Sequence, residues 1–443
     1  MARSSSVSDL ARIIHLNLTR AGVHSLGLRL LTRFLDTIYL ASLKTEEGKP
    51  PQIRISLVDP ENPDPDKPRR IRANRWKITK LASPLPFTVQ NLVKLSKAAD
   101  PWSSSLAVYI SARAGFFIWG MVDQTVHFNT MLVRESESGF APPGLFQIVA
   151  TGTADLSVYR GYGFVGRLAQ DTLLKRQNDV FWAGPIRGCL ADGLSKHLER
   201  VVRVAQRNGA KVDRIWRSAF AETWISTLCR LLISIQRYSH GGALLITRSK
   251  ADLDVKYKIN YSRLPKALTN LGLARIRAGM AGDQISEEYL EESRDSMPVM
   301  LYRHEAIAEY DSEDYEHEIT GSVRFVSALS CVDGLILATP DLAVIGFGVE
   351  IRTRKEPDVV FLASTPHARE NSLHRVNPND YGTRHRSMMR YCFAHPKSVG
   401  FVISQDGEIR VMTRVKARLI MWENLKVLSL WEEDYKKSSA TRK

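Results

Sequence analysis

The stretch Gly382-Thr383-Arg384-His385-Arg386 is the most informative part of this 443-residue chain. The residues after it predict a helix from about 384 to 395, which Pro396 ends and which the Thr383 hydroxyl can cap. The free amide donors at a helix start attract anions, and arginine side chains bind phosphate oxygens through paired hydrogen bonds. The stretch therefore predicts a polyphosphate site, with ordinary surface ion pairs for the two arginines as the alternative.

An Asp-Gly pair, Asp333-Gly334, lies about fifty residues earlier, after a helix expected over 320–330. A hairpin of strands 335–338 and 342–350 is expected to follow it. A carboxylate at the edge of a sheet can bind Mg²⁺ or Mn²⁺ or orient a ribose hydroxyl, and ligands usually bind at the carboxyl ends of strands or at a switch point. An ordinary turn aspartate is the alternative.

A serine hydroxyl is a third candidate for a phosphate contact. Ser404 ends an apolar run expected to be a buried strand over 399–404. A second strand is expected over 408–412, with the Asp406-Gly407 pair as a two-residue hairpin turn. Taken alone, Ser404 is equally explained as a strand-end residue.

The order of patterns along the chain predicts two domains. Strands are expected over 106–110, 116–122, 145–150 and 156–159, after a helical segment over 1–45 and a proline-rich loop over 58–74. Helices are expected from Asp192 to Asn208 and from Asp213 to Tyr238, followed by a buried strand over 241–246 and an exposed acidic segment over 287–292. We therefore predict an N-terminal α+β domain, residues 1–209, and a C-terminal α/β domain, residues 210–443.

Charge and composition restrict the class of protein. The net charge of +15 is compatible with nucleic acid or a polyanionic small ligand, but no nucleic-acid-binding motif accompanies it. Arg200, Arg203 and Arg207 share one side of a predicted helix, a pattern typical of a solvated face. Four scattered cysteines favour a reducing, cytoplasmic location, and no apolar run is long enough to predict a membrane span. The arginines among residues 1–43 fit an amphipathic helix better than a transit segment.

Taken in order, these motifs resemble the diadenylate cyclase domain. The resemblance covers roughly residues 210–430, and its specific part is the Gly-Thr-Arg-His-Arg stretch; Asp-Gly alone is not specific. It implies a mixed β-sheet flanked by helices, the condensation of two ATP molecules into cyclic di-AMP, and Mg²⁺ or Mn²⁺ as cofactor. It also implies a homodimer, because two sites must face each other for each hydroxyl to reach the other α-phosphate.

The resemblance implies a role for each residue of the motifs. Asp333 is expected to bind the metal and help to activate the 3′-hydroxyl, while Gly334 and Leu335 meet the nucleotide. The phosphates are expected to contact the Gly382–Arg386 stretch, with Arg384, His385 and Arg386 as its catalytic members and Gly382 and Thr383 as binding residues, and Ser404 is expected to contact them too. Residues 1–209 resemble, more weakly, the DACNV-like sensor regions that precede some members of the family.

The chain departs from the family pattern at several positions, and three hypotheses for its function stay open. Leu335 replaces an alanine, and Ser387-Met388 replaces a pair of small residues. The first hypothesis is a cytoplasmic diadenylate cyclase regulated by its N-terminal domain. The second is a nucleotide-binding sensor of the same fold that has lost turnover. The third, a nucleic-acid-binding protein, depends on the net charge alone.

Overall fold

The computed structural model divides the chain into two compact units, which are described separately. The first contains the described residues up to Gln177, and the second contains Asn178–Val427. The structure describes residues 4–22, 26–46, 48, 50–61, 77–101, 103–111, 115–125, 144–161, 163–210, 212–238, 240–286, 299–405 and 407–427. Parts of the predicted loop over 58–74, the acidic segment 287–292 and Asp406 lie outside these residues.

The first unit is built on an eight-stranded sheet of order β2-β4-β3-β1-β5-β6-β7-β8. Its one parallel pairing joins β1 to β3, and the other pairings are antiparallel, so the sheet is mixed. The strands are β1 (Ile53–Leu57), β2 (Lys77–Pro86), β3 (Ser104–Ser111), β4 (Gly115–Asp123), β5 (Gln147–Gly152), β6 (Asp155–Arg160), β7 (Gly163–Ala169) and β8 (Thr172–Leu174).

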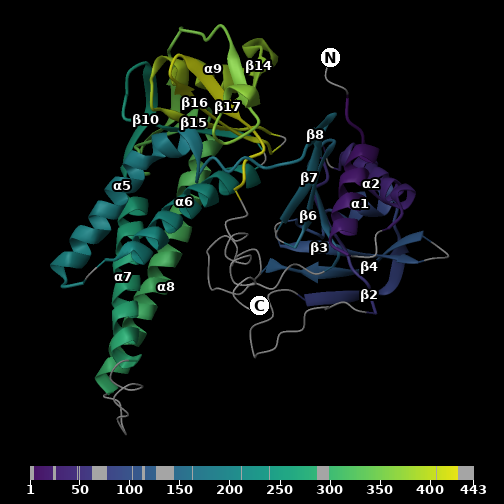
Figure 1. The fold of residues 1–443 in the computed structure, drawn as a ribbon, viewed down its shortest axis with the longest axis horizontal. Helices are drawn as coiled ribbons and strands as arrows, with labels where there is room; N and C mark the ends of the chain where they lie inside the picture. The colour runs from purple at the N-terminus through teal and green to yellow at the C-terminus, as the bar shows by residue number, and fades with distance from the viewer. Residues whose placement is uncertain are drawn as a thin grey trace. The chain divides into compact units, whose positions relative to one another are not determined.

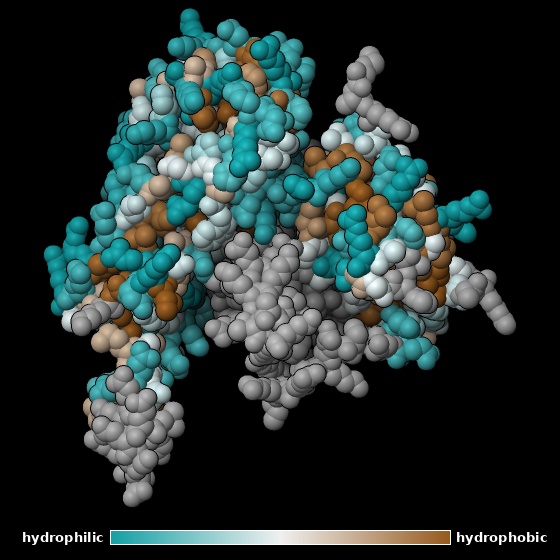
Figure 2. Space-filling model, viewed as in Figure 1, coloured by the Kyte–Doolittle hydropathy of each residue, from teal (hydrophilic) through white to brown (hydrophobic). Residues whose placement is uncertain are grey.

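Helices cover the core of the first unit. The predicted helical segment forms two helices, α1 (Val7–Arg20) and α2 (Leu28–Ser42), and α3 (Val89–Leu95) follows β2. Both α1 and α2 bury one apolar face against the sheet, α1 on β7 and α2 on β5 and β6. On their outer faces they carry exposed leucines, and Figure 2 shows hydrophobic residues over these helices.

The second unit contains a nine-stranded mixed sheet of order β10-β12-β11-β9-β15-β16-β17-β13-β14. The strands are β9 (Gly242–Ile246), β10 (Leu253–Tyr261), β11 (Leu335–Ala338), β12 (Val344–Ile351), β13 (Val360–Ala363), β14 (Leu373–Val376), β15 (Val399–Ile403), β16 (Ile409–Val415) and β17 (Arg418–Trp422). The central strand β9 pairs in parallel with β11 and antiparallel with β15. This arrangement confirms the predicted mixed sheet flanked by helices.

Helices lie on both faces of this sheet, which explains why β9 and β15 are apolar at every position. The helices are α5 (Gly184–Arg207), α6 (Arg214–Arg237), α7 (Arg263–Ser286), α8 (Val299–Ala328) and α9 (Thr383–Ala394). Alternate residues of β9 and β15 pack under α9, while α5 and α6 pack against β15. Helices α7 and α8 run side by side as a long pair (Figure 1).

The boundary between the units differs from the predicted one. We expected it between residues 209 and 210, whereas the compact units meet between Gln177 and Asn178. The physical reason is that α5 packs against α6, α7 and β16, all in the second unit. The helix pattern before residue 210 was recognised in the sequence, but its partners were not.

Among the described residues, none of the helices combines the length and the apolar character that crossing a bilayer requires.

Candidate functional site

Three neighbouring strands bring the candidate residues to one end of the second sheet. Strand β9 lies between β11 and β15, and Ile403 of β15 pairs with Gly242 of β9. The chain before β11, the chain before β9 and the chain after β15 therefore meet at the same end, across about 10 Å of sheet. These segments contain Asp333, Gly241 and Ser404, so the sheet brings together motifs that lie far apart in the sequence.

This end is the amino end of β9 and β11. We expected the carboxyl end or a switch point, where ligands of α/β sheets usually bind. Asp333 precedes its strand instead of following it, and the parallel neighbour β9 begins at the same end. The prediction that Asp333 lies at an end of the sheet is confirmed, and this end is also the carboxyl end of the antiparallel strand β15.

Arg384 connects the start of α9 with this end of the sheet. A Cβ atom added to Gly241 would lie 2.5 Å from Arg384 Nη1, 3.0 Å from the Ile403 carbonyl oxygen and 3.4 Å from the Gln405 amide nitrogen. The guanidinium group therefore occupies the space over a glycine, beside the end of β15. Arg384 is exposed, and in the described part of the chain it has no hydrogen bond or ion pair.

Asp333 is the matching unpaired anion. It is exposed, and its carboxylate has no hydrogen bond or ion pair with any described residue. Just before it, Ser330 lies against β9, because a Cβ at Gly242 would be 3.1 Å from Ser330 Cβ. An unpaired carboxylate and an unpaired guanidinium thus lie at the same end of the sheet.

Gly334 and Leu335 both have structural reasons for their identity. Gly334 has φ +112°, and a Cβ there would lie 2.6 Å from the Gly348 carbonyl carbon of β12, so only glycine fits. Leu335 is 6% exposed and packs in the core beneath α9. A leucine in place of the family's alanine is therefore accommodated by the packing of the strand.

The start of α9 corrects one prediction. We expected the Thr383 hydroxyl to cap the helix, but the cap residue is Gly382, with no side-chain cap hydrogen bond, and Thr383 is the first helical residue. Both residues are exposed. In an α-helix the amides of the first residues have no partner within the helix, and here these include the amides of Thr383 and Arg384.

His385 points into the protein. The residue is 8% exposed, its ring centroid lies 5.8 Å from that of Tyr381, and Arg410 Nη1 lies 3.4 Å from its Nε2. Because arginine can only donate, His385 Nε2 accepts this hydrogen bond. Burial raises the pKa of Tyr381 above its usual value. These contacts fix the first turn of α9 on β16.

Arg386 is already paired. Its Nη2 lies 3.8 Å from Glu356 Oε1, and Arg390 from the next turn binds the same carboxylate. The hydrogen bond from Arg390, and then the charges of both arginines, lower the pKa of Glu356 from its ordinary value. The surface ion pair that the sequence left open as an alternative therefore applies to Arg386 and not to Arg384.

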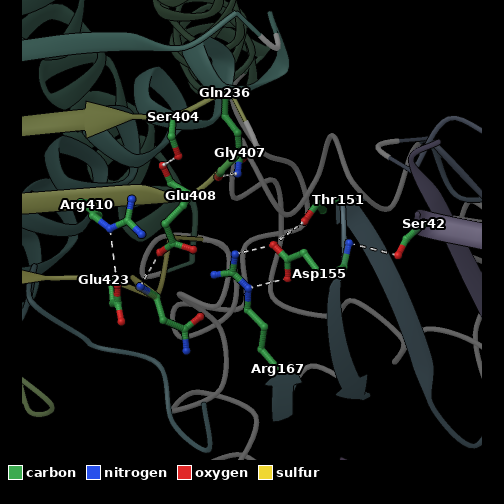
Figure 3. Close-up of polar contacts among 12 residues, drawn as sticks. Ser42, Thr151, Asp155, Arg167, Gln236, Ser404, Gly407, Glu408, Arg410 and Glu423 are labelled. Atoms are coloured by element: carbon green, nitrogen blue, oxygen red, sulfur yellow. Dashed lines mark hydrogen bonds and ion pairs between the residues drawn. The ribbon is translucent and has the colours of Figure 1, made fainter. Parts of the chain in front are cut away.

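Ser404 also has an internal partner. Its hydroxyl donates to the Glu408 carbonyl oxygen at 3.2 Å, and its amide donates to the same oxygen at 3.0 Å (Figure 3). Gln236 of α6 donates to the Gly407 carbonyl oxygen in the same β15–β16 connection. Ser404 thus shapes the hairpin connection.

Sequence reasoning missed a histidine–cysteine contact at the candidate site. His240 Nδ1 lies 2.8 Å from the Gly241 carbonyl oxygen, and its Nε2 lies 3.0 Å from Cys331 Sγ. The first contact requires a proton on Nδ1, so the thiol donates to Nε2. Burial raises the pKa of Cys331, which agrees with a protonated thiol. In the sequence, the Gly241-Gly242 pair before a buried strand was the only sign of a tight backbone turn next to this contact.

The side chains at the candidate site determine whether it can hold a metal ion. Among the described residues there is no group of three or more histidine, cysteine or acidic side chains arranged to hold a metal ion. A single exposed carboxylate, Asp333, nevertheless fits Mg²⁺, which usually keeps several waters and takes its other ligands from substrate phosphates. The residues present are therefore compatible with a metal that arrives with a nucleotide.

Comparison with known proteins concerns the first unit. Residues 27–123 match the family model described as "Probable sensor domain DACNV". The match runs from the beginning of α2 to the end of β4 and does not include the candidate site. No curated protein matches the chain. The expected sensor-type resemblance is therefore confirmed for residues 27–123, which are similar to a sensor domain.

Proposed function

We propose that the second unit binds ATP at the candidate site and condenses two ATP molecules into cyclic di-AMP. Each 3′-hydroxyl attacks the α-phosphate of the other ATP and releases its pyrophosphate, so that two pyrophosphates leave per cyclic di-AMP. The sensor-like first unit regulates this activity. The observation that carries this proposal is the pair of unpaired charges, Asp333 and Arg384, at one end of the sheet beside Gly241. Phosphoryl transfer depends mainly on positioning and on neutralising phosphate charge, which such groups provide.

The exposed residues of the candidate site are proposed to contact the ligand, and the buried residue His385 to position the helix. The Arg384 side chain and the amides of Thr383 and Arg384 at the start of α9 bind the phosphates. Asp333 holds Mg²⁺ or Mn²⁺, which supplies charge neutralisation at the phosphates when it is bound, and accepts a hydrogen bond from the 3′-hydroxyl. His385 is a positioning residue, because its ring contacts Arg410 and Tyr381. Since one site holds one ATP, two copies of the chain face each other during the reaction.

Product analysis tests this activity. Purified chain is incubated with ATP and Mn²⁺, and the products are identified by mass spectrometry. We expect cyclic di-AMP from the wild type, and a loss of about 10²-fold or more in Asp333→Asn and Arg384→Gln. Asp283→Asn is the control, since it removes an exposed carboxylate on α7, outside the candidate site. Equal product from Asp333→Asn and the wild type would refute the role of Asp333.

A nucleotide-binding sensor without turnover is the second candidate. The internal partners of Ser404, His385 and Arg386 favour it, because they leave fewer side chains for the phosphates. It predicts that ATP binds in equilibrium dialysis and that Arg384→Gln weakens this binding, while no product forms. Accumulation of cyclic di-AMP by the wild type would eliminate it.

A further inference from the structure

A basic cavity lies in the second unit between α5, the start of α7 and the β11–β12 turn. Its volume is about 490 Å³, and four cations line it: Arg200, Arg203, Arg207 and Lys266. Asp341 from the turn is the acidic residue among its lining residues, so these side chains carry a net charge of +3. The arginine side of the predicted α5 helix is therefore the wall of a cavity and more than a solvated face.

The walls of this basic cavity are packed closely. A Cβ added to Gly193 of α5 would lie 1.7 Å from the Pro340 carbonyl oxygen, so α5 touches the β11–β12 turn directly. A Cβ added to Gly272 of α7 would lie 2.9 Å from Val201 Cγ1 of α5. The two helices also contact each other at further positions. The cavity is therefore formed by fixed elements.

Most of its positive charge has no internal partner. Arg200 pairs with Asp341, which also accepts a hydrogen bond from the Thr339 hydroxyl at 2.7 Å. Arg203, Arg207 and Lys266 are exposed, and none of their side chains has a hydrogen bond or ion pair with any described residue. Arginines four positions apart on one helix repel each other. Three unpaired cations around one hollow are arranged to receive an anion.

The basic cavity is separate from the candidate site. Strand β11 begins two residues after Asp333, and its other end leads into the turn that contains Pro340 and Asp341. The two places thus lie at opposite ends of the same strand. None of the residues that we assign to the candidate site lines the cavity.

We propose that the basic cavity is a second binding site, whose ligand is a phosphorylated small molecule. Arginine forks and a lysine match the charge and geometry of phosphate oxygens. Ser262 and Asn270 add groups that can hydrogen-bond to a ligand, while Val204 and Pro265 offer apolar contact. The volume falls within the range of small-molecule sites, about 300–1,000 Å³.

The shape argues against nucleic acid as the ligand. A nucleic-acid strand needs a groove or stripe of cations along which its backbone can lie. Here the cations converge on one hollow between two helices and a turn. A compact ligand can contact all of them at once.

Isothermal titration of the full chain with inorganic tripolyphosphate tests the proposal. We expect the Arg203→Gln/Arg207→Gln double variant to weaken binding at one site by about tenfold or more, since it removes two charge-assisted contacts. Lys266→Gln, on a different helix, is expected to weaken the same site. The matched control is Arg303→Gln/Arg324→Gln, which removes the same charge from exposed positions on α8 outside the cavity. Circular dichroism checks that each variant is folded.

The candidate site can also bind tripolyphosphate, so the titration is repeated with Arg384→Gln. Binding that persists there and is lost only in the cavity variants supports the second site, whether or not the proposed cyclase activity holds. Unchanged affinity in both cavity variants overturns the proposal, and so does an equal loss in the α8 control. A single-stranded DNA oligonucleotide is titrated in parallel. If the cavity variants lose only DNA binding, the surface binds nucleic acid and the proposal is wrong.

Discussion

Among the residues at the candidate site, Gly241 shows most clearly how the identity of one residue determines the local geometry. Gly241 has φ +74°, a conformation that residues with a Cβ adopt only with strain, and its missing side chain leaves the space that Arg384 occupies. The residue thus serves both the backbone and the placement of the guanidinium group. An added methyl group would disturb both roles, and the two effects can be measured separately. Strain in the backbone lowers the stability of the fold, whereas displacement of the guanidinium group weakens ligand binding.

We therefore predict that Gly241→Ala weakens ATP binding by about tenfold, as expected when one charge-assisted contact is displaced. It should also lower the free energy of unfolding by about 1–2 kcal/mol through the positive φ. Gly209→Ala is the control, because Gly209 has φ +78° and a Cβ there would meet no atom within 4 Å. Equilibrium dialysis and urea unfolding measure the two effects. Equal ATP affinity of the two variants would show that the position of Arg384 does not depend on the room that Gly241 leaves.

A buried histidine on α5 gives a pH-dependent stability. His197 is 3% exposed, and burial, followed by the nearby charge of Arg200, lowers its pKa from 6.5 to about 4. The folded chain therefore keeps His197 neutral, whereas the unfolded chain protonates it below about pH 6.5. The unfolded state binds more protons between these values, so stability rises with pH across this window and falls on acidification.

Between pH 7 and pH 5, His197 should contribute a loss of about 2 kcal/mol in the free energy of unfolding. We expect His197→Gln to remove that part of the pH dependence, whatever its effect on stability at pH 7. Urea unfolding of both proteins at the two pH values gives the comparison. The same pH slope in both proteins would show that His197 is protonated in the folded chain.

At the scale of elements, α5 depends on one close approach to the sheet. Gly193 faces the Pro340 carbonyl oxygen, and a methyl group there would force α5 away from the β11–β12 turn. We predict that Gly193→Ala lowers the free energy of unfolding by about 1–3 kcal/mol, as in other overpacked contacts. Because Arg200 pairs with Asp341 across this contact, the variant should also disturb the basic cavity.

The same helix supplies the control for that prediction. Gly188 is exposed, and a Cβ there would meet no atom within 4 Å, so Gly188→Ala should stabilise the helix by about 0.5–1 kcal/mol. Urea unfolding of the two alanine variants is expected to give opposite signs. Equal effects would mean that the close contact between Gly193 and Pro340 is not made in solution.

The elements that the sequence predicted well are those with a strong local pattern. The apolar periodicity from Asp213 to Tyr238 became α6, and the apolar runs at 335–338 and 399–404 became β11 and β15. The Thr383 cap was predicted wrongly, because Gly382 and Thr383 can both begin the helix and local pattern does not choose between them. The partners of Arg386 and Ser404 depend on distant residues, so no local pattern indicated them.

At the scale of the whole molecule, the sequence predicted two units but placed their boundary at the wrong helix. A helix shows its apolar face in the sequence, but the pattern does not say which sheet covers that face. The face of α5, which includes Leu190, Leu194 and Val201, is buried within the second unit. For the same reason the sequence could describe Arg200, Arg203 and Arg207 only as a stripe, because the cavity exists only once α7 and the turn are in place.

Shortened chains test where the second unit begins. A chain that starts at Asn178 keeps α5, and we expect it to unfold in one cooperative transition. A chain that starts at Ala210 lacks α5 and exposes the apolar surface that this helix covers on α6, α7 and the sheet. Four large or medium apolar side chains of α5 are buried, at about 1.5–3 kcal/mol each. Their loss is comparable to the whole net stability of an ordinary domain, about 5–15 kcal/mol.

We therefore expect the chain from Ala210 to lack a cooperative transition in thermal unfolding followed by circular dichroism, and to bind a dye that reports exposed apolar surface. The chain from Asn178 should do neither, and it also retains the Asn178 side chain, whose Nδ2 donates to the Glu423 carbonyl oxygen at 2.9 Å. A cooperative transition of equal midpoint in both chains would return the boundary to residue 210 and would make α5 an accessory helix, because its buried face would then contribute nothing to the stability of the sheet that it covers.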